Sequence, residues 1–299
     1  MKDCPIRLIA FKEFSDRLRS GWVLACILVW LGAIGLTSFL GLLQIGQIGA
    51  LGYERTVASL LNLVQYLVPL LGLLLGHDLV VSEREEGTLR LVLASGVSRA
   101  KLLLGKFIGG CLTLMTPLIL GFALAGVVIG LSAKDHGIAP FVRLALTSMA
   151  MGVVFLSVGL AISTFCRTRV QALVAALLVW CLVVFVFDLV ALGVIISTKS
   201  SAAAQEIEIV CDAAHVNSSV DLHSDFDATA ANPAHTAATE SHGASLGWLA
   251  INPVDLFRAV NLAPQLGLRV PAAIPALALT LWLALTLGAS RWKLLRTDL

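Results

Sequence analysis

Six long apolar stretches constrain the fold of this chain more than any other feature of its sequence. They cover residues 22–43, 57–76, 107–131, 144–165, 170–197 and 271–290, and they carry few or no charged side chains. A helix of about 20 apolar residues spans the ~30 Å hydrocarbon core of a bilayer. A helix also satisfies its own backbone hydrogen bonds there. The sequence therefore predicts an all-α polytopic membrane protein with six transmembrane helices.

Composition excludes an ordinary soluble domain. Hydrophobic residues make up 58% of the 299 positions and charged residues only 13%, whereas soluble domains carry about 25% charged residues. The six cysteines show no paired spacing, so neither a disulfide framework nor a zinc ribbon is expected. The N-terminus is charged well before the first apolar stretch, which does not fit a cleavable signal peptide.

The basic residues predict the orientation of the helices. If the N-terminus is cytoplasmic, fifteen of the 21 Lys and Arg residues fall in cytoplasmic segments, as the positive-inside rule requires. Both termini are then cytoplasmic. Residues 1–21 carry Ile6, Ile9, Phe14 and Leu18 at helical spacing among charges. They are expected to form an amphipathic helix on the membrane surface, although a plain basic flank would show similar charge.

A dense cluster of charge, residues 77–106, separates the second apolar stretch from the third. Ser82 and Glu85 have the spacing of a capping box, and the acids that follow Ser82 would lie in a first helical turn, where the helix dipole favours them. Leu89, Val92 and Leu93 would form one apolar face. These features predict one amphipathic helix over Ser82–Leu93, in water on the cytoplasmic side. A solvated loop is the alternative.

A long outer segment, residues 198–270, precedes the last apolar stretch. Its first part, 198–245, has seven acids against one base and little apolar periodicity, so we expect it to be disordered. Asn252-Pro253 then predicts a helix start, with Asn252 as the N-cap and Pro253 in the first turn.

Few residues point to chemistry within this chain. No Gly-x-x-x-x-Gly-Lys-Ser/Thr motif is present, so the chain is not expected to bind ATP. His77 and Asp78 are adjacent, and adjacent helical residues point about 100° apart, which makes a poor catalytic pair. We predict no catalytic residues and no bound cofactor; an intramembrane enzyme remains the alternative from another class.

Two further groups of polar residues leave alternatives open. Asp188 interrupts an apolar stretch, and a carboxylate at membrane depth usually faces protein or water. It could serve as a hinge or pathway residue, or bond a neighbouring helix. The outer segment also contains potential metal ligands, namely Cys211, His215, His223, His235 and His242. Their irregular spacing favours a solvated segment over a metal site.

Several motifs resemble those of ABC-2-type transporter permeases. The pattern Glu83-x-Glu85-Glu86-Gly87-Thr88-Leu89, then Gly96-Val97-Ser98-Arg99 and Gly105-Lys106, is similar to the cytoplasmic segment of that family. Three further motifs are similar to its NosY-type branch, namely Phe11–Asp16, Val186–Leu189 and Asn252–Arg258 with Asn261-Leu262. The chain departs from that branch in the length of residues 198–245.

The resemblance implies a single permease domain over residues 1–299, in the inner membrane of a bacterium. It implies a homodimer that docks on a separate cytoplasmic ATPase, which binds the ATP. The implied coupling segment is residues 82–106. Its implied coupling residues are Ser82, Glu83, Glu85, Glu86, Gly87, Thr88, Leu89 and Arg99.

On the outer side, the resemblance implies a periplasmic β-helical partner, with Asn252, Pro253, Phe257 and Arg258 as contacts. Such assemblies process copper for the maturation of nitrous oxide reductase. An ABC-2 permease that exports a lipid, a peptide or a drug is the alternative. No nucleic-acid partner is expected.

Overall fold

The computed structural model describes the chain in eight parts, residues 5–44, 49–94, 97–132, 138–186, 189, 252–262, 271 and 273–296. These parts are helical and contain no strand, so the predicted all-α class is confirmed for the described residues. The chain divides into two compact units, residues 1–180 with 249–299, and residues 181–248. The contacts described below lie within the first unit.

The helices follow the apolar stretches. They are α1 (Pro5–Leu18), α2 (Gly21–Gln44), α3 (Gly49–Gly76), α4 (Val81–Glu85), α5 (Thr88–Ala94), α6 (Arg99–Ser132), α7 (Ala139–Phe165), α8 (Arg169–Cys181), α11 (Pro253–Leu262) and α12 (Ala273–Arg296). A π-helix, Leu182–Val186, continues α8.

Five described helices are long and apolar enough to cross a membrane, namely Gly21–Phe39, Val57–Glu85, Arg99–Val128, Ala139–Phe165 and Ala273–Arg296. The second of these ranges comprises most of α3, the turn after it and α4. These helices match five of the six predicted spans. The remaining one, predicted over 170–197, begins as the shorter apolar helix Arg169–Phe185. Most of its second half, including Asp188, lies outside the described residues.

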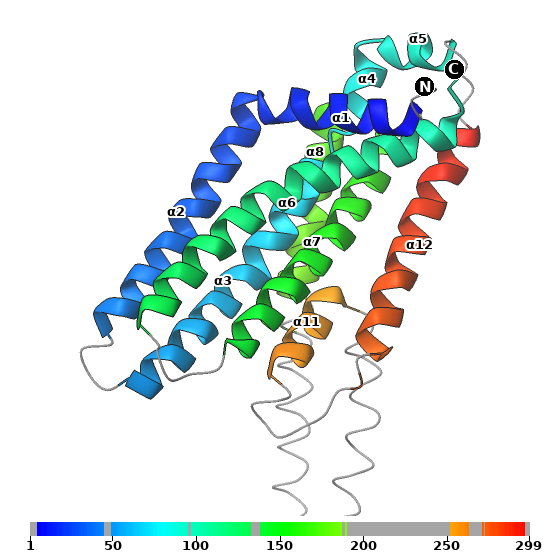
Figure 1. The fold of residues 1–299 in the computed structure, drawn as a ribbon. Helices are drawn as coiled ribbons and strands as arrows, with labels where there is room; N and C mark the ends of the chain where they lie inside the picture. The colour runs from blue at the N-terminus through cyan, green and yellow to red at the C-terminus, as the bar shows by residue number, and fades with distance from the viewer. Residues whose placement is uncertain are drawn as a thin grey trace, which may run out of the picture. The chain divides into compact units, whose positions relative to one another are not determined.

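The bundle is organised around α3 and α7, which pack along each other, while α2 and α6 pack beside α3 and α12 packs against α7. Figure 1 shows α1, α4 and α5 at one end of the bundle, together with the last turn of α12. Helix α11 lies at the opposite end, against α7, α3 and α12. The charged segment and the helices nearest the two termini therefore share one end, as predicted; that this end is cytoplasmic stays a prediction.

Helix α1 lies across the end of α6, and part of its predicted membrane face contacts protein instead. A Cβ on Gly105 would lie 2.8 Å from Ile9 Cγ2 and 3.2 Å from the Ile6 carbonyl oxygen. Leu8 and Phe11 are the exposed apolar residues of α1. The helix over residues 5–18 is thus confirmed, but the Ile6–Ile9 side is used for packing because the glycines of α6 leave room for it.

Glycines allow the close approach of α3 and α7. A Cβ on Gly76 would lie 2.6 Å from the Leu156 carbonyl oxygen and 2.8 Å from Gly159 Cα. Conversely, a Cβ on Gly159 would lie 2.9 Å from Gly76 Cα. Small residues at such crossings let two backbones make van der Waals contact, which is a main source of helix association in membranes.

We expect Gly76→Ala to destabilise the bundle, because the added methyl group would collide with backbone rather than with a side chain that can move. Overpacking of this kind costs about 1–3 kcal/mol. Gly32→Ala in α2 is the matched control, since a Cβ there meets nothing within 4 Å. The measurement is the temperature at which the detergent-purified protein loses its monodisperse elution peak. Equal temperatures for both variants would contradict close α3–α7 packing.

Candidate functional site

The charged segment forms two short helices rather than the single predicted one. Helix α4 covers Val81–Glu85 and α5 covers Thr88–Ala94. The predicted capping box is wrong: the N-cap of α4 is Val80, and no side chain of the segment caps it there. Ser82 lies inside α4, and its hydroxyl donates to the Asp78 carbonyl 2.7 Å away.

Gly87 separates the two helices because of its backbone conformation. Its φ of 72° lies in the left-handed region, which glycine adopts without the steric cost that a side chain would add. A Cβ there would meet nothing within 4 Å in this chain, so the backbone conformation, not packing within the bundle, favours glycine at this position. Thr88 then starts α5, and its hydroxyl donates to the Glu83 carbonyl at 3.4 Å.

Two leucines of α5 face opposite ways among its described side chains. Leu89 is buried, as predicted for the apolar face, whereas Leu91 is 72% exposed. Ala94, three residues further along, is also exposed. Residues three apart lie on the same side of a helix, so Leu91 and Ala94 form an outward face at this end of the molecule.

The start of α4 is held by α7. The Ser163 hydroxyl accepts the backbone N–H groups of Val80 and Val81, each at 2.9 Å. Backbone donors at a helix start have no partner within the helix. The acceptor for the Val80 and Val81 N–H groups is therefore a hydroxyl of another helix, more than 80 residues away. Ser163, which carries it, is fully buried.

Arginine side chains bind the last turns of three spanning helices at this end of the bundle. Arg84 of α4 donates to the Cys166 carbonyl at 2.6 Å and to that of Thr164, at the end of α7. Arg99, at the start of α6, donates to the Leu294 carbonyl of α12 at 2.6 Å.

The third guanidinium belongs to α1. Arg17 donates to the Leu75 carbonyl of α3 at 3.1 Å. Carbonyls in a last helical turn lack intrahelical partners, and the helix dipole favours a cation there. Arg99, expected to contact the ATPase, thus has a partner within the chain.

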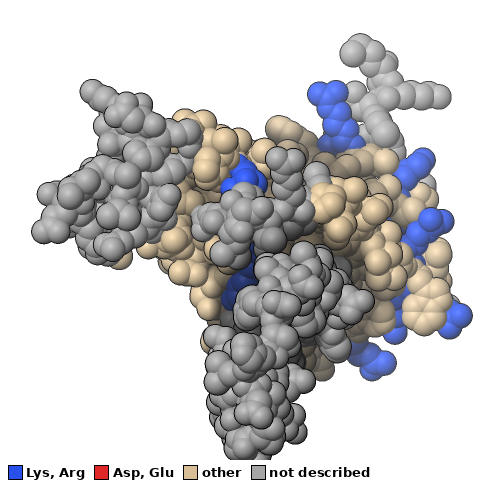
Figure 2. All heavy atoms as spheres, turned by 90° about the horizontal axis from the view of Figure 1, so that it is seen from below, with Lys and Arg blue, Asp and Glu red and all other residues tan. Residues whose placement is uncertain are grey.

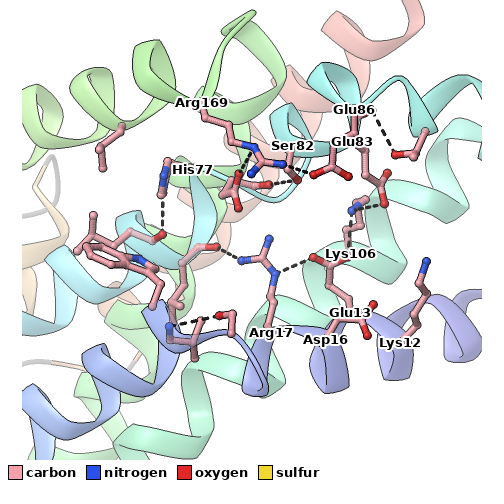
Figure 3. A pocket seen from close by; sticks show the side chains of 18 residues that line it. Lys12, Glu13, Asp16, Arg17, His77, Ser82, Glu83, Glu86, Lys106 and Arg169 are labelled. Carbon is pink, nitrogen blue, oxygen red and sulfur yellow. Dashed lines mark hydrogen bonds and ion pairs between the residues drawn. The ribbon is translucent and has the colours of Figure 1, made fainter.

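Lys106 joins α6 to both α1 and α4. Its ammonium lies 3.0 Å from Glu13 Oε2 and 2.9 Å from Glu83 Oε1, and its side chain is only 2% exposed. Figure 3 shows Lys106 between the two carboxylates, with Arg17 on the other side of Glu13 at 2.6 Å. Glu83, expected to face a partner, therefore forms a shielded ion pair within the chain.

Glu13 shows the electrostatic effect of this arrangement. Burial alone would raise the pKa of its carboxyl group, but the charges of Lys106 and Arg17 outweigh that effect and lower the pKa below its ordinary value. Glu13 is therefore ionised near neutral pH, and its single negative charge interacts with both Arg17 and Lys106.

Arg169, the first residue of α8, meets three acids of the charged segment. Its guanidinium lies 3.6 Å from Asp78 Oδ1 and 3.3 Å from Glu85 Oε2, and it also pairs with Glu86. Its backbone N–H donates to Glu85 Oε1 at 2.8 Å. Glu85 therefore caps α8, not α4 as predicted. Glu86, expected as an external contact, already has an internal partner.

A hollow of about 640 Å³ lies among these groups. Its wall includes charged residues of α1, α4 and α6 together with Arg169, as Figure 3 shows, and also Trp22 and Leu75. His77 lines it too, with Nδ1 2.6 Å from the Leu74 carbonyl oxygen. Among the described residues, no group of three or more His, Cys, Asp or Glu side chains could hold a metal ion.

The predicted outer contact residues fix α11 to the bundle. Asn252 Oδ1 accepts the Val254 N–H at 3.0 Å, which confirms the predicted N-cap. Asn252, Pro253 and Phe257 are buried, while Arg258 donates to Gln65 of α3 at 2.6 Å. Figure 2 views this end of the molecule, and the charged side chains visible on the described surface are basic. A partner contact here stays a prediction.

Sequence reasoning missed Arg84, Ser163 and Arg169 as site residues. Their partners lie about 80 positions away along the chain. Helical periodicity relates only residues within a few turns of one another, so it could not predict these pairs. The sequence did contain one indication of these contacts. Arg167 and Arg169 directly follow the fourth span, and such charged side chains must be paired with acids or solvated by water.

We expect Glu83→Gln to destabilise the protein more than Glu86→Gln. The first change leaves the shielded Lys106 with one carboxylate fewer, a loss of about 1–3 kcal/mol. Glu86 is 57% exposed, and exposed pairs contribute about 0–1 kcal/mol. The measurement is thermal unfolding in detergent, with Lys106→Met added to Glu83→Gln. If the double variant were no more stable than Glu83→Gln alone, the result would contradict an energetic coupling between Lys106 and Glu83.

The lowered pKa of Glu13 predicts the sign of a pH effect. A carboxyl group whose pKa is lower in the folded state stabilises the fold above its ordinary pKa of 4.5. That contribution is lost as the pH falls through the folded-state value. Wild type should therefore be more stable than Glu13→Gln at pH ~7, and the difference should shrink toward pH ~3. A difference that stays constant would show that charge is not its cause.

The comparisons with known proteins agree with this architecture. The family model described as ABC-2 family transporter protein matches residues 7–299. The chain is 33% identical over 293 residues to a protein of Pseudomonas aeruginosa named "Probable ABC transporter permease protein NosY", covering 94% of this chain and 92% of that one. A Stutzerimonas stutzeri protein of the same name is 32% identical over 290 residues, covering 93% and 91%. The chain therefore belongs to the ABC-2 family of transporter proteins.

Proposed function

We propose that this chain is the permease subunit of a NosY-type ABC transporter and that a separate ATPase drives it through residues 82–106. ABC-2 permeases are multi-pass membrane subunits that work with a cytoplasmic ATPase. One observation carries the proposal. The segment is bonded to α1, α7, α8 and α12, so a force applied to it reaches these four helices together.

The bonds give this transmission a physical route. Arg84 and Ser163 join α4 to α7, and Glu83 joins it to Lys106 of α6 and through that residue to Glu13 of α1. Arg99, just beyond α5, joins α6 to α12. A displacement of α4 and α5 must break these bonds or move the helices that they hold.

Helix α5 offers a surface on which an ATPase can dock. Its outward residue Leu91 lies at the end of the bundle opposite α11. A binding interface needs a central aromatic or aliphatic anchor that fills a pocket on the partner. The acids of α4 and its C-cap are less suited to this role, because Glu83, Glu85 and Glu86 are already paired within the chain.

The finer assignment follows the NosY relatives. We propose that the chain forms a homodimer in a bacterial inner membrane, that ATP binds only to the ATPase, and that a periplasmic partner receives the movement. Its role would be copper processing for nitrous oxide reductase maturation. The similarity over nearly the full length to two proteins of that name supports this assignment.

We expect Leu91→Asp to reduce recovery of the ATPase about tenfold or more, because it places an unpaired charge at an apolar anchor. Leu295→Asp is the matched control: it is the same change, also exposed, at the same end of the bundle but outside the segment. The measurement is co-purification of the ATPase, normalised to membrane level. Wild-type recovery with Leu91→Asp would remove α5 from the interface.

The copper assignment has its own test. Partners co-purified with wild type from its host are identified by mass spectrometry, and nitrous oxide reductase from a strain lacking this chain is assayed for copper. We expect a periplasmic partner and a copper-depleted reductase. An ATPase partner with a fully copper-loaded reductase would instead favour export of a lipid, a peptide or a drug.

A further inference from the structure

Helix α8 is joined to the charged segment by a different kind of contact from that of its neighbours. The bonds to α7 and α6 use groups shielded from water, namely Ser163 and Lys106. The bonds to α8 use Arg169, whose side chain is 43% exposed, and three acids that are about a third or more exposed. Arg169 Nε and Asp78 Oδ1 are themselves buried, so the pair with Glu86, whose side chain is 57% exposed, is the contact nearest to water. We call the group Asp78, Glu85, Glu86 and Arg169 the Arg169 clasp.

The packing of α8 adds little resistance to movement. Its buried residues are Ala172 and Ala176, and an alanine methyl group buries little apolar area. Its other side carries exposed Val170, Val174 and Leu178. In its last turn, Trp180 Nε1 donates to the Tyr66 carbonyl at 3.0 Å. The described part of α8 is thus bonded near its two ends, with a smooth face of small residues between them.

The arrangement of the clasp also allows an acid to exchange Arg169 for another basic partner. Three carboxylates surround one guanidinium, so a basic group from outside can pair with one of them while Arg169 keeps the others. Exposed ion pairs are weak and are screened by salt. The Lys106 contacts are shielded and therefore resist both screening and exchange.

We propose that Arg169 is a positioning residue that holds the first turn of α8 against α4, and that the clasp opens when the charged segment moves. This role rests on the proposed function, because an ATPase is what moves the segment. Opening would free α8 from the segment, while Arg84, Ser163 and Lys106 keep α7, α6 and α1 attached. The nucleotide-driven movement thus separates α8 from the rest of the bundle at this end.

The backbone of α8 reports directly on the clasp. Thr168 caps the helix by accepting the Gln171 N–H at 3.3 Å, whereas the Arg169 N–H depends on Glu85 of the clasp. Hydrogen–deuterium exchange of residues 167–175 therefore distinguishes a closed clasp from an open one. Loss of a cap should speed exchange there by about two- to thirtyfold.

The first measurement needs no partner. In the full chain in nanodiscs, raising NaCl from about 0.05 M to 1 M should speed exchange at the start of α8, because screening lengths shorten over this range. The amides of Val80 and Val81, which bond to buried Ser163, should not respond. Salt-independent exchange at α8 would overturn the clasp, whether or not an ATPase binds.

The second measurement uses the complex with the ATPase. Wild type should show faster exchange at the start of α8 in the ATP-bound state than without nucleotide. Arg169→Gln should assemble normally but exchange fast in both states and lose ATP-driven activity; Arg169→Lys, which keeps the charge, should restore part of the difference. Arg167→Gln is the matched control, since its side chain forms no ion pair with the described part of the chain.

The outcomes separate the two proposals. Failure of wild type to bind any ATPase would reject the proposed function. The salt measurement alone would then decide whether the clasp exists. A complex in which α5 responds to ATP while α8 does not would show that the segment moves with the clasp closed. Wild-type ATP-driven activity of the Arg169→Gln variant would equally overturn the role proposed for Arg169.

Discussion

The end of a membrane-spanning helix leaves backbone carbonyls without partners, and the rest of this structure depends on how that need is met. At one end of the bundle the acceptors in the last turns of α3, α7 and α12 bind Arg17, Arg84 and Arg99. A guanidinium suits this place, because it presents several donors in a fixed plane and stays charged. The charged segment therefore has a structural role: without Arg84 and Arg99, the carbonyls at the ends of α7 and α12 would lose these hydrogen bonds.

Solvent access divides the ion pairs of the segment into two kinds. Lys106 is shielded, so removing one of its partners leaves a buried charge poorly compensated, which is costly. Arg169 and Glu86 lie nearer to water, so the bond between them can break and be replaced by hydration at little cost. One segment can then hold α6 firmly and α8 loosely, although both connections are ion pairs between Arg or Lys and Glu. Burial, not residue type, makes the difference.

Features that depend on local periodicity could be predicted from the sequence. Apolar length located the five described spans, and the Asn252–Pro253 pair located the start of α11. The predicted cap of α4 failed because Ser82 and Glu85 have the right spacing but other partners: the Asp78 carbonyl takes the hydroxyl of Ser82, and α8 takes Glu85. Partners such as Arg99 and Leu294 lie 195 positions apart, and only the packing of the helices brings them together.

The break at Gly87 explains why the segment consists of two helices. A continuous helix would keep the side chains of α4 and α5 in a fixed rotational relation, 100° per residue. The left-handed turn releases α5 from that relation. Helix α4 can then direct Glu83, Arg84 and Glu85 toward the bundle while α5 presents Leu91 outward. A five-residue helix is not stable alone, so α4 exists because α7 supplies Ser163 to its first turn. Whatever displaces α4 must therefore work against α7, the helix at the centre of the bundle.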